Sequence, residues 1–150
     1  MIKIIIWLLL SILSGIAYRL GGIGKPFKSW MRDGICPLIA LVALWLLVGF
    51  KSSYWWAYLL HFGLLFGALT TYWKKKGADA YWYNWLLTGL GYSLSAIPIV
   101  WINGHWLGFF IRTITLSGAI TLWSVKIGNA KWEERGRGFA IIITLPLLLI

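Results

Sequence analysis

Acidic and basic side chains in the short charged stretches of this chain could act on a phosphate group. Carboxylates can hold a divalent metal ion beside a phosphate, and arginines can bind the phosphate oxygens. A lipid-headgroup enzyme of this kind would draw on the carboxylates Asp79, Glu133 and Glu134 and on the arginines Arg32, Arg135 and Arg137. No two carboxylates recur at a recognisable ligand spacing, so we expect neither a metal site nor a cofactor.

The four carboxylates also suit structural roles. Asp33 and Asp79 stand where the N-caps of two helices belong. Glu133 and Glu134 open the last predicted helix, where negative charge suits the helix dipole, and Glu133 can pair with Arg137 one turn further on. We therefore keep the headgroup enzyme, with an active site on the cytoplasmic face, as the alternative function.

Other catalytic motifs are incomplete in this sequence. The glycine-rich run 21–25 fails as a phosphate-binding loop, because Arg19 and Pro26 stand where that motif needs a glycine and a Ser or Thr. The single cysteine, Cys36, excludes an intramolecular disulfide and a cysteine-cluster metal site. The sequence has no recognisable nucleophile–base pair or acid–base dyad, which favours a function without catalysis.

Composition places the chain in a membrane. Of its 150 residues, 60% are apolar and 12% are charged, whereas a soluble domain carries about a quarter of charged residues. The net charge of +10 is confined to short stretches between apolar runs. We therefore expect anionic phospholipid headgroups as partners, and no nucleic acid.

Apolar segments of nearly bilayer-spanning length fill most of the chain. A spanning helix needs about 20 apolar residues, and polar or charged turns separate the runs here. The five predicted spans are residues 2–18, 34–50, 53–73, 80–102 and 104–124, followed by a shorter apolar helix at 138–150. The sequence thus predicts an all-α, polytopic transmembrane bundle in a single domain, 1–150, with five spans and a short sixth helix.

The distribution of basic residues predicts the orientation of this bundle. Short loops rich in Lys and Arg stay in the cytoplasm. With the N-terminus outside, all of the 14 Lys and Arg except Lys3, Lys51 and Arg112 lie on the cytoplasmic side. The twelve tryptophans divide between the two membrane boundaries, which is typical of interfacial belts. We expect an inner-membrane protein whose phosphate-binding residues are Arg19, Lys25, Lys28, Arg32, Lys74, Lys75, Lys76, Arg135 and Arg137.

Polar residues within the spans form a second set of candidates. His61 lies near mid-membrane and is predicted to be a hydrogen-bonded interior residue rather than a metal ligand. Two helical stripes, Asn84, Thr88, Tyr92 and Ser95 in one span and Thr113, Ser117, Thr121 and Ser124 in the next, each share a face. With the small residues Gly91 and Gly118, they either pack against each other or line a hydrated path.

Arg112 is a charge inside a span, which costs about 2.5 to 3.5 kcal/mol on insertion scales. It lies about 12 Å from the start of its helix at about 1.5 Å per residue. The run from Gly138 ends at a similar depth, so we expect the terminal carboxylate of Ile150 to pair with Arg112. The alternatives are that Arg112 bonds backbone carbonyls, Tyr hydroxyls or water in the bundle, or that the last helix begins earlier, near Trp132, and spans the membrane fully.

Two stretches resemble small uncharacterised membrane proteins of bacteriophages and prophages. One is Asn-Ala-Lys-Trp-Glu-Glu-Arg-Gly-Arg-Gly-Phe at 129–139, which runs into 144–148, and the other is Gly-Ala-Leu-Thr-Thr-Tyr-Trp at 67–73. The resemblance implies a bacterial inner membrane and supplies no activity. The leading hypothesis is a phage-type membrane protein that binds lipid or a host membrane protein, or forms a small pore, with homo-oligomers permitted by the Gly63/Gly67 GxxxG pair.

Overall fold

The computed structural model describes residues 1–21, 29–72, 82–127 and 130–150, and side chains for 1–21, 29–70, 87–120 and 135–150. All regular elements within these residues are helical, which confirms the all-α class. The α-helices are α1 (Ile2–Leu20), α2 (Cys36–Val48), α3 (Trp55–Tyr72), α4 (Trp82–Leu94), α5 (Ile97–Asn103), α6 (Trp106–Ile127) and α7 (Ala130–Ile143).

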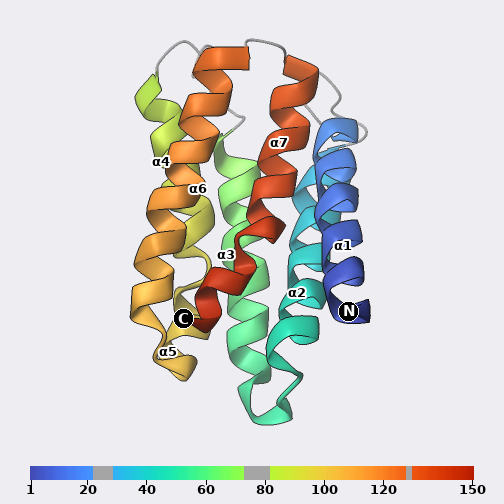
Figure 1. Ribbon diagram of the computed structural model, residues 1–150, viewed down its shortest axis with the longest axis vertical. Helices are drawn as coiled ribbons and strands as arrows, with labels where there is room; N and C mark the ends of the chain where they lie inside the picture. The colour runs from blue at the N-terminus through green and yellow to red at the C-terminus, as the bar shows by residue number, and fades with distance from the viewer. Residues whose placement is uncertain (22–28, 73–81, 128–129) are drawn as a thin grey trace.

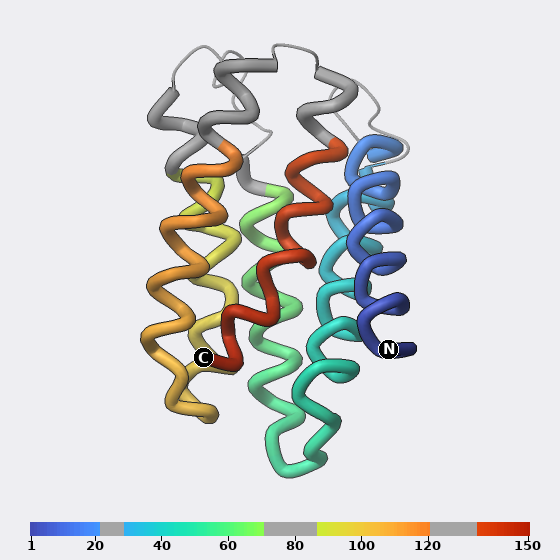
Figure 2. Tube along the Cα trace, in the orientation of Figure 1, coloured from blue at the N-terminus to red at the C-terminus, as the bar shows by residue number. Residues whose placement is uncertain are grey.

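The long helices run side by side in one elongated bundle (Figure 1). α3 contacts α2, α4 and α5, while α7 lies across the opposite face between α1 and α6. The most extensive contacts join α1 to α7 and α4 to α6. The chain after α7 ends beside the start of α6 (Figure 2).

Prolines explain where the helices differ from the predicted segments. The predicted helix 80–102 is two helices, α4 and α5, because Pro98 has no N–H and its ring would collide with the carbonyl of Leu94. Pro146 likewise ends α7, and the chain continues as a 3₁₀ segment, Leu145–Leu149. The predicted turn at Asn103-Gly104 is confirmed, since Gly104 adopts the left-handed conformation that ends α5 (φ 73°).

The last helix begins at Ala130 and not at 138. Hydropathy placed residues 130–137 in a loop because they include Lys131, Glu133, Glu134, Arg135 and Arg137. Lys, Glu and Arg are good helix formers, so this charged stretch continues the apolar helix instead of ending it. The early start near Trp132 is therefore confirmed, while the full span that was predicted with it stays a prediction.

Apolar surface faces outward over much of the molecule. Within the described residues, 2–20 and 31–48 are long and apolar enough to cross a membrane, and 106–120 is a shorter apolar helix. In the most apolar 18-residue stretch of each of these two segments, 28% and 33% of the residues are buried, whereas the core helix of a soluble protein is mostly buried. This outward apolar surface supports association with a membrane.

Basic side chains gather at one end of the bundle, whereas exposed tryptophans occur at both ends, with Trp30 close to the start of α2. Arg19, Arg32, Arg135 and Arg137 lie where α1 ends and where α2 and α7 begin, which we call the basic end (Figure 1). Lys51 lies at the opposite end, between α2 and α3. Exposed tryptophans surround that opposite end, namely Trp45, Trp55, Trp56, Trp101 and Trp106.

Candidate functional site

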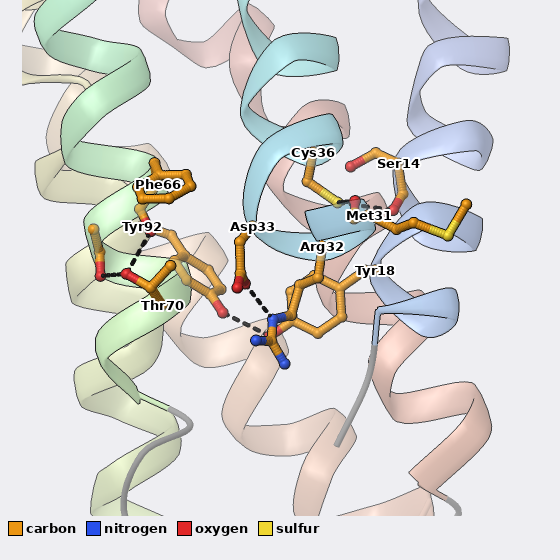
Figure 3. A network of polar contacts seen from close by, with 10 residues as sticks. Ser14, Tyr18, Met31, Arg32, Asp33, Cys36, Phe66, Thr70 and Tyr92 are labelled. Atoms are coloured by element: carbon orange, nitrogen blue, oxygen red, sulfur yellow. Dashed lines mark hydrogen bonds and ion pairs between the residues drawn. The ribbon is translucent and has the colours of Figure 1, made fainter. Parts of the chain in front are cut away.

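A buried group of polar side chains lies at the basic end (Figure 3). It collects residues from four elements: α1, the segment Met31–Ile35 that precedes α2, α4 and α7. We call it the basic-end cluster, and its members are Tyr18, Arg32, Asp33, Tyr92 and Arg137.

Arg32 and Asp33 form an ion pair within the cluster. The Nε atom of Arg32 donates to Oδ1 of Asp33 at 2.7 Å, and the two side chains are 7% and 12% exposed. Both residues belong to a π-helical turn, Met31–Ile35, which continues directly into α2. Wider turns of this kind often occur at functional sites, because they turn side chains off the regular helical pattern.

Asp33 is therefore not the N-cap of the second helix, and that prediction is wrong. Helical backbone begins before Asp33, so the N–H groups that follow it already lie within helical turns. No side-chain cap is formed at the start of this segment or of α2. The carboxylate of Asp33 instead neutralises the neighbouring guanidinium.

Tyr18, Tyr92 and Arg137 form the second part of the cluster. The hydroxyls of Tyr18 and Tyr92 are 2.7 Å apart, and the side chain of Arg137 hydrogen-bonds Tyr18. A guanidinium only donates, whereas a phenol can accept and donate at once, so the three side chains can form a continuous hydrogen-bonded chain. Arg32 also acts electrostatically on both phenols, which joins the two parts of the cluster.

Close contact between α1 and α7 brings Arg137 to Tyr18. A Cβ atom at Gly15 would lie 2.7 Å from the carbonyl oxygen of Arg135, and one at Gly138 would lie 2.7 Å from Cβ of Tyr18. Glycine is required where two helix backbones approach this closely. Arg137, beside Gly138, is thereby buried against α1.

The phenol pair gives a stability prediction. Tyr18→Phe or Tyr92→Phe should each lower the free energy of unfolding by about 1 kcal/mol, because each leaves the other buried hydroxyl with one partner fewer. The double variant should lower the free energy of unfolding by less than the sum of the two single losses, since it leaves no buried tyrosine hydroxyl without the hydroxyl that faced it. Strict additivity in this double-mutant cycle, measured by unfolding in detergent, would contradict a direct hydroxyl contact.

A second buried polar centre lies farther from the basic end. His61 on α3 is fully buried, and its Nδ1 is 2.8 Å from the carbonyl oxygen of Ser95, in the break between α4 and α5. The prediction of a hydrogen-bonded interior histidine is thus confirmed. Arg112 on α6 is also fully buried, acts electrostatically on His61, and donates from Nη2 to the carbonyl oxygen of Ile141 at 3.2 Å.

The predicted ion pair between Arg112 and the carboxylate of Ile150 is wrong. Ile150 is 60% exposed, and the residue that Arg112 bonds is Ile141. The 3₁₀ segment after α7 turns the chain end toward Gly108, one helical turn before Arg112 on α6. The alternative of a bond to a backbone carbonyl is the one observed.

The two polar stripes pack against each other where they are described. A Cβ atom at Gly89 on α4 would overlap the Cα atom of Ser117 on α6, so the backbones touch there. Thr88, Tyr92, Ser95 and Ser117 are buried. The close approach uses Gly89. A Cβ atom at Gly118 would have nothing within 4 Å, and one at Gly91 would make an ordinary contact, 3.7 Å, with Cβ of Ala68 on α3. Packing, rather than a hydrated path, accounts for these side chains.

The structure describes only some of the predicted site residues. Arg19 and Arg135 are described, and they are half-buried at the basic end, beside the buried Arg32 and Arg137. The backbone of Glu133 and Glu134 lies in the first turns of α7. Outside the described residues or side chains lie Lys25, Lys28, Lys74, Lys75, Lys76, Asp79 and the side chains of Asn84, Glu133 and Glu134.

The cluster holds two buried guanidiniums and one buried carboxylate, so its formal charge is positive. Guanidiniums bind phosphate oxygens through paired N–H donors, and phenols add further donors. Among the described residues, no group of three or more His, Cys, Asp or Glu could hold a metal ion. Comparisons with protein-family models, with curated proteins and with solved structures find no match to this chain.

Proposed function

We propose that the protein is a non-enzymatic, multi-pass protein of a bacterial inner membrane that binds anionic phospholipid at the basic end of its bundle. In this proposal five segments span the bilayer, the N-terminus is outside, and the basic end faces the cytoplasm. The resemblance to phage and prophage membrane proteins agrees with that compartment. The Lys and Arg count on the two sides supports the orientation.

The burial of Arg32 and Arg137 at one end is the observation that carries the proposal. Arginines are costly to bury in a membrane protein, and those that occur there commonly mark functional sites. Here they lie at the end where a phospholipid phosphate would be, with Arg19 and Arg135 half-buried around them.

Lipid retention tests this function. The intact protein, extracted in mild detergent from vesicles of equal parts phosphatidylcholine and phosphatidylglycerol, should retain phosphatidylglycerol preferentially in native mass spectrometry. Retention should fall as salt rises, because exposed charges are screened. Arg135→Gln should weaken retention about fivefold, since one Arg near an anionic surface contributes about 1 kcal/mol.

Lys51→Gln is the matched control, because it removes the same charge at the opposite end of the bundle. We expect it to leave retention unchanged. Equal retention of the two lipids by the wild type, or equal losses in the two variants, would contradict a specific site at the basic end.

A further inference from the structure

A seam between α1 and α7 runs along the bundle to its basic end. The two helices lie side by side (Figure 1). Far from the basic end, Nε1 of Trp7 donates to the carbonyl oxygen of Ile142 at 3.1 Å. Nearer the basic end the two backbones meet at Gly15 and Gly138, so the helices are antiparallel.

Two arginines, one from each helix, lie where the seam reaches the basic end. Arg135 is directly across from Gly15, because a Cβ atom at Gly15 would be 2.7 Å from the carbonyl oxygen of Arg135. Arg19 follows Gly15 by four residues, so it lies one helical turn, about 6 Å, nearer the basic end. Side chains lean toward the N-terminus of their own helix, so Arg135 leans toward the basic end and Arg19 leans back toward Arg135.

Arg19 and Arg135 also differ from the other two arginines of the basic end in their exposure. Arg32 and Arg137 are buried, and they bond Asp33 and Tyr18 within the basic-end cluster. Arg19 and Arg135 are only half-buried. Of these four guanidiniums, the two at the seam are therefore the ones that a ligand at the surface of the bundle can contact.

Apolar side chains continue the seam away from the two arginines. Leu8 and Ile12 precede Arg19 on the same edge of α1, and both are exposed. Phe139 of α7 is exposed on the other side of the seam, and its Cβ would be 3.6 Å from a Cβ atom at Gly15. The seam thus combines a basic end with an apolar edge that faces outward.

We infer that this seam binds one anionic phospholipid whose phosphate is held jointly by Arg19 and Arg135. One acyl chain lies along the apolar edge, over Ile12 and Phe139. The inference rests on the proposed function and names the two side chains that hold the phosphate. From Arg19 to Leu8 the edge is about 16 Å long, which matches half of a hydrocarbon core about 30 Å thick.

The two parts of the seam together select a lipid. Guanidiniums bind phosphate oxygens through paired N–H donors, and one phosphate has enough oxygens for two of them. A free phosphate ion would contact the arginines and leave the apolar edge uncovered. An apolar helix of another protein would cover the edge and bring no anion to the arginines. A molecule with a negative headgroup and a hydrocarbon chain matches both parts.

Neutralising each arginine tests the joint site. In native mass spectrometry after extraction from the mixed phosphatidylcholine and phosphatidylglycerol vesicles, Arg19→Gln should weaken retention of phosphatidylglycerol about fivefold, as expected for Arg135→Gln. Both variants should weaken the same single bound lipid, so the double variant should lose one phosphatidylglycerol and not two. Lys3→Gln is the matched control, because Lys3 carries the same charge at the other end of α1, and it should leave retention unchanged.

Two measurements on the unmodified protein keep the inference testable if a variant fails to fold. Phosphatidylglycerol with a photoreactive diazirine in its acyl chain should crosslink to residues 8–19 and 135–143, as located by peptide mass spectrometry. Inorganic phosphate should not displace the lipid when it replaces chloride at equal ionic strength. Displacement would show a site for free phosphate and would overturn the inference.

The outcomes separate the seam from the general function. Weaker retention in Arg135→Gln with unchanged retention in Arg19→Gln would overturn the joint site and leave the proposed function standing. Crosslinks confined to other helices would do the same. Absence of a preference for phosphatidylglycerol in the wild type would overturn both.

Discussion

Gly138→Ala is expected to lower the free energy of unfolding by about 1 to 3 kcal/mol, which is the usual cost of overpacking a tight contact. The added Cβ atom would overlap the carbonyl oxygen of Ser14 and would lie 2.9 Å from Cα of Gly15. Both neighbours are backbone atoms of α1, so α7 must move as a whole. The effect should appear as a lower thermal midpoint in detergent.

Gly63→Ala is the matched control for this variant. Gly63 is also within a helix, but nothing lies within 4 Å of the position that its Cβ would take. Alanine is a better helix former than glycine by about 1 kcal/mol, so this variant should be neutral or more stable. Equal destabilisation by the two substitutions would contradict the close approach of α1 and α7.

Displacement of α7 should also disturb the basic-end cluster. Arg137 precedes Gly138 and hydrogen-bonds Tyr18, so a shift of the helix would separate the two side chains. Gly138→Ala should therefore weaken phosphatidylglycerol retention, whereas Gly63→Ala should not. A fall in stability with unchanged retention would indicate that Arg137 reaches its ligand independently of the α1–α7 contact.

Hydropathy and charge were sufficient to predict the helical class and the approximate positions of most helices. They could not predict the extent of α7, because Lys131, Glu133 and Arg135 interrupt the apolar run while favouring helix. The break at Pro98 could have been found from the sequence, since proline inside a helical pattern commonly ends it.

The basic-end cluster was predicted in part. Arg32 and Arg137 were candidates for phosphate binding, and the structure brings both to the cluster. Tyr18 was not a candidate, because its role depends on the pairing of α1 with α7, which links residues far apart in the chain. Small residues at matching positions, Gly15 and Gly138, were the available signal for that pairing.

Arg112→Met is expected to raise the free energy of unfolding by about 2 to 3 kcal/mol. Nη2 of Arg112 has a partner, but Nε and Nη1 are buried and have none among the described residues. Replacing a buried ion pair by apolar side chains of similar volume is often neutral or stabilising by about 1 to 4 kcal/mol, and a buried guanidinium with two unsatisfied donors carries the same kind of desolvation cost. Met fills irregular space well and removes the two unsatisfied donors. Unfolding titrations in mixed micelles would measure the change.

Comparison of Arg112→Ala with Arg112→Met distinguishes the effect of removing the charge from the effect of removing the side-chain volume. Arg112→Ala removes the same charge but leaves a cavity between α6 and α7, and deletion of a large buried side chain costs about 2 to 5 kcal/mol. We therefore expect Ala to be less stable than Met by at least about 2 kcal/mol. A Met variant less stable than the wild type would contradict this account, because it would mean that the guanidinium is held by a group such as a buried water.

A water of this kind would also bond His61, which acts electrostatically with Arg112 and whose Nε2 is buried without a partner among the described residues. Such a water would couple Arg112→Met to His61→Phe in a double-mutant cycle, whereas an unsatisfied guanidinium predicts that the two changes are nearly additive.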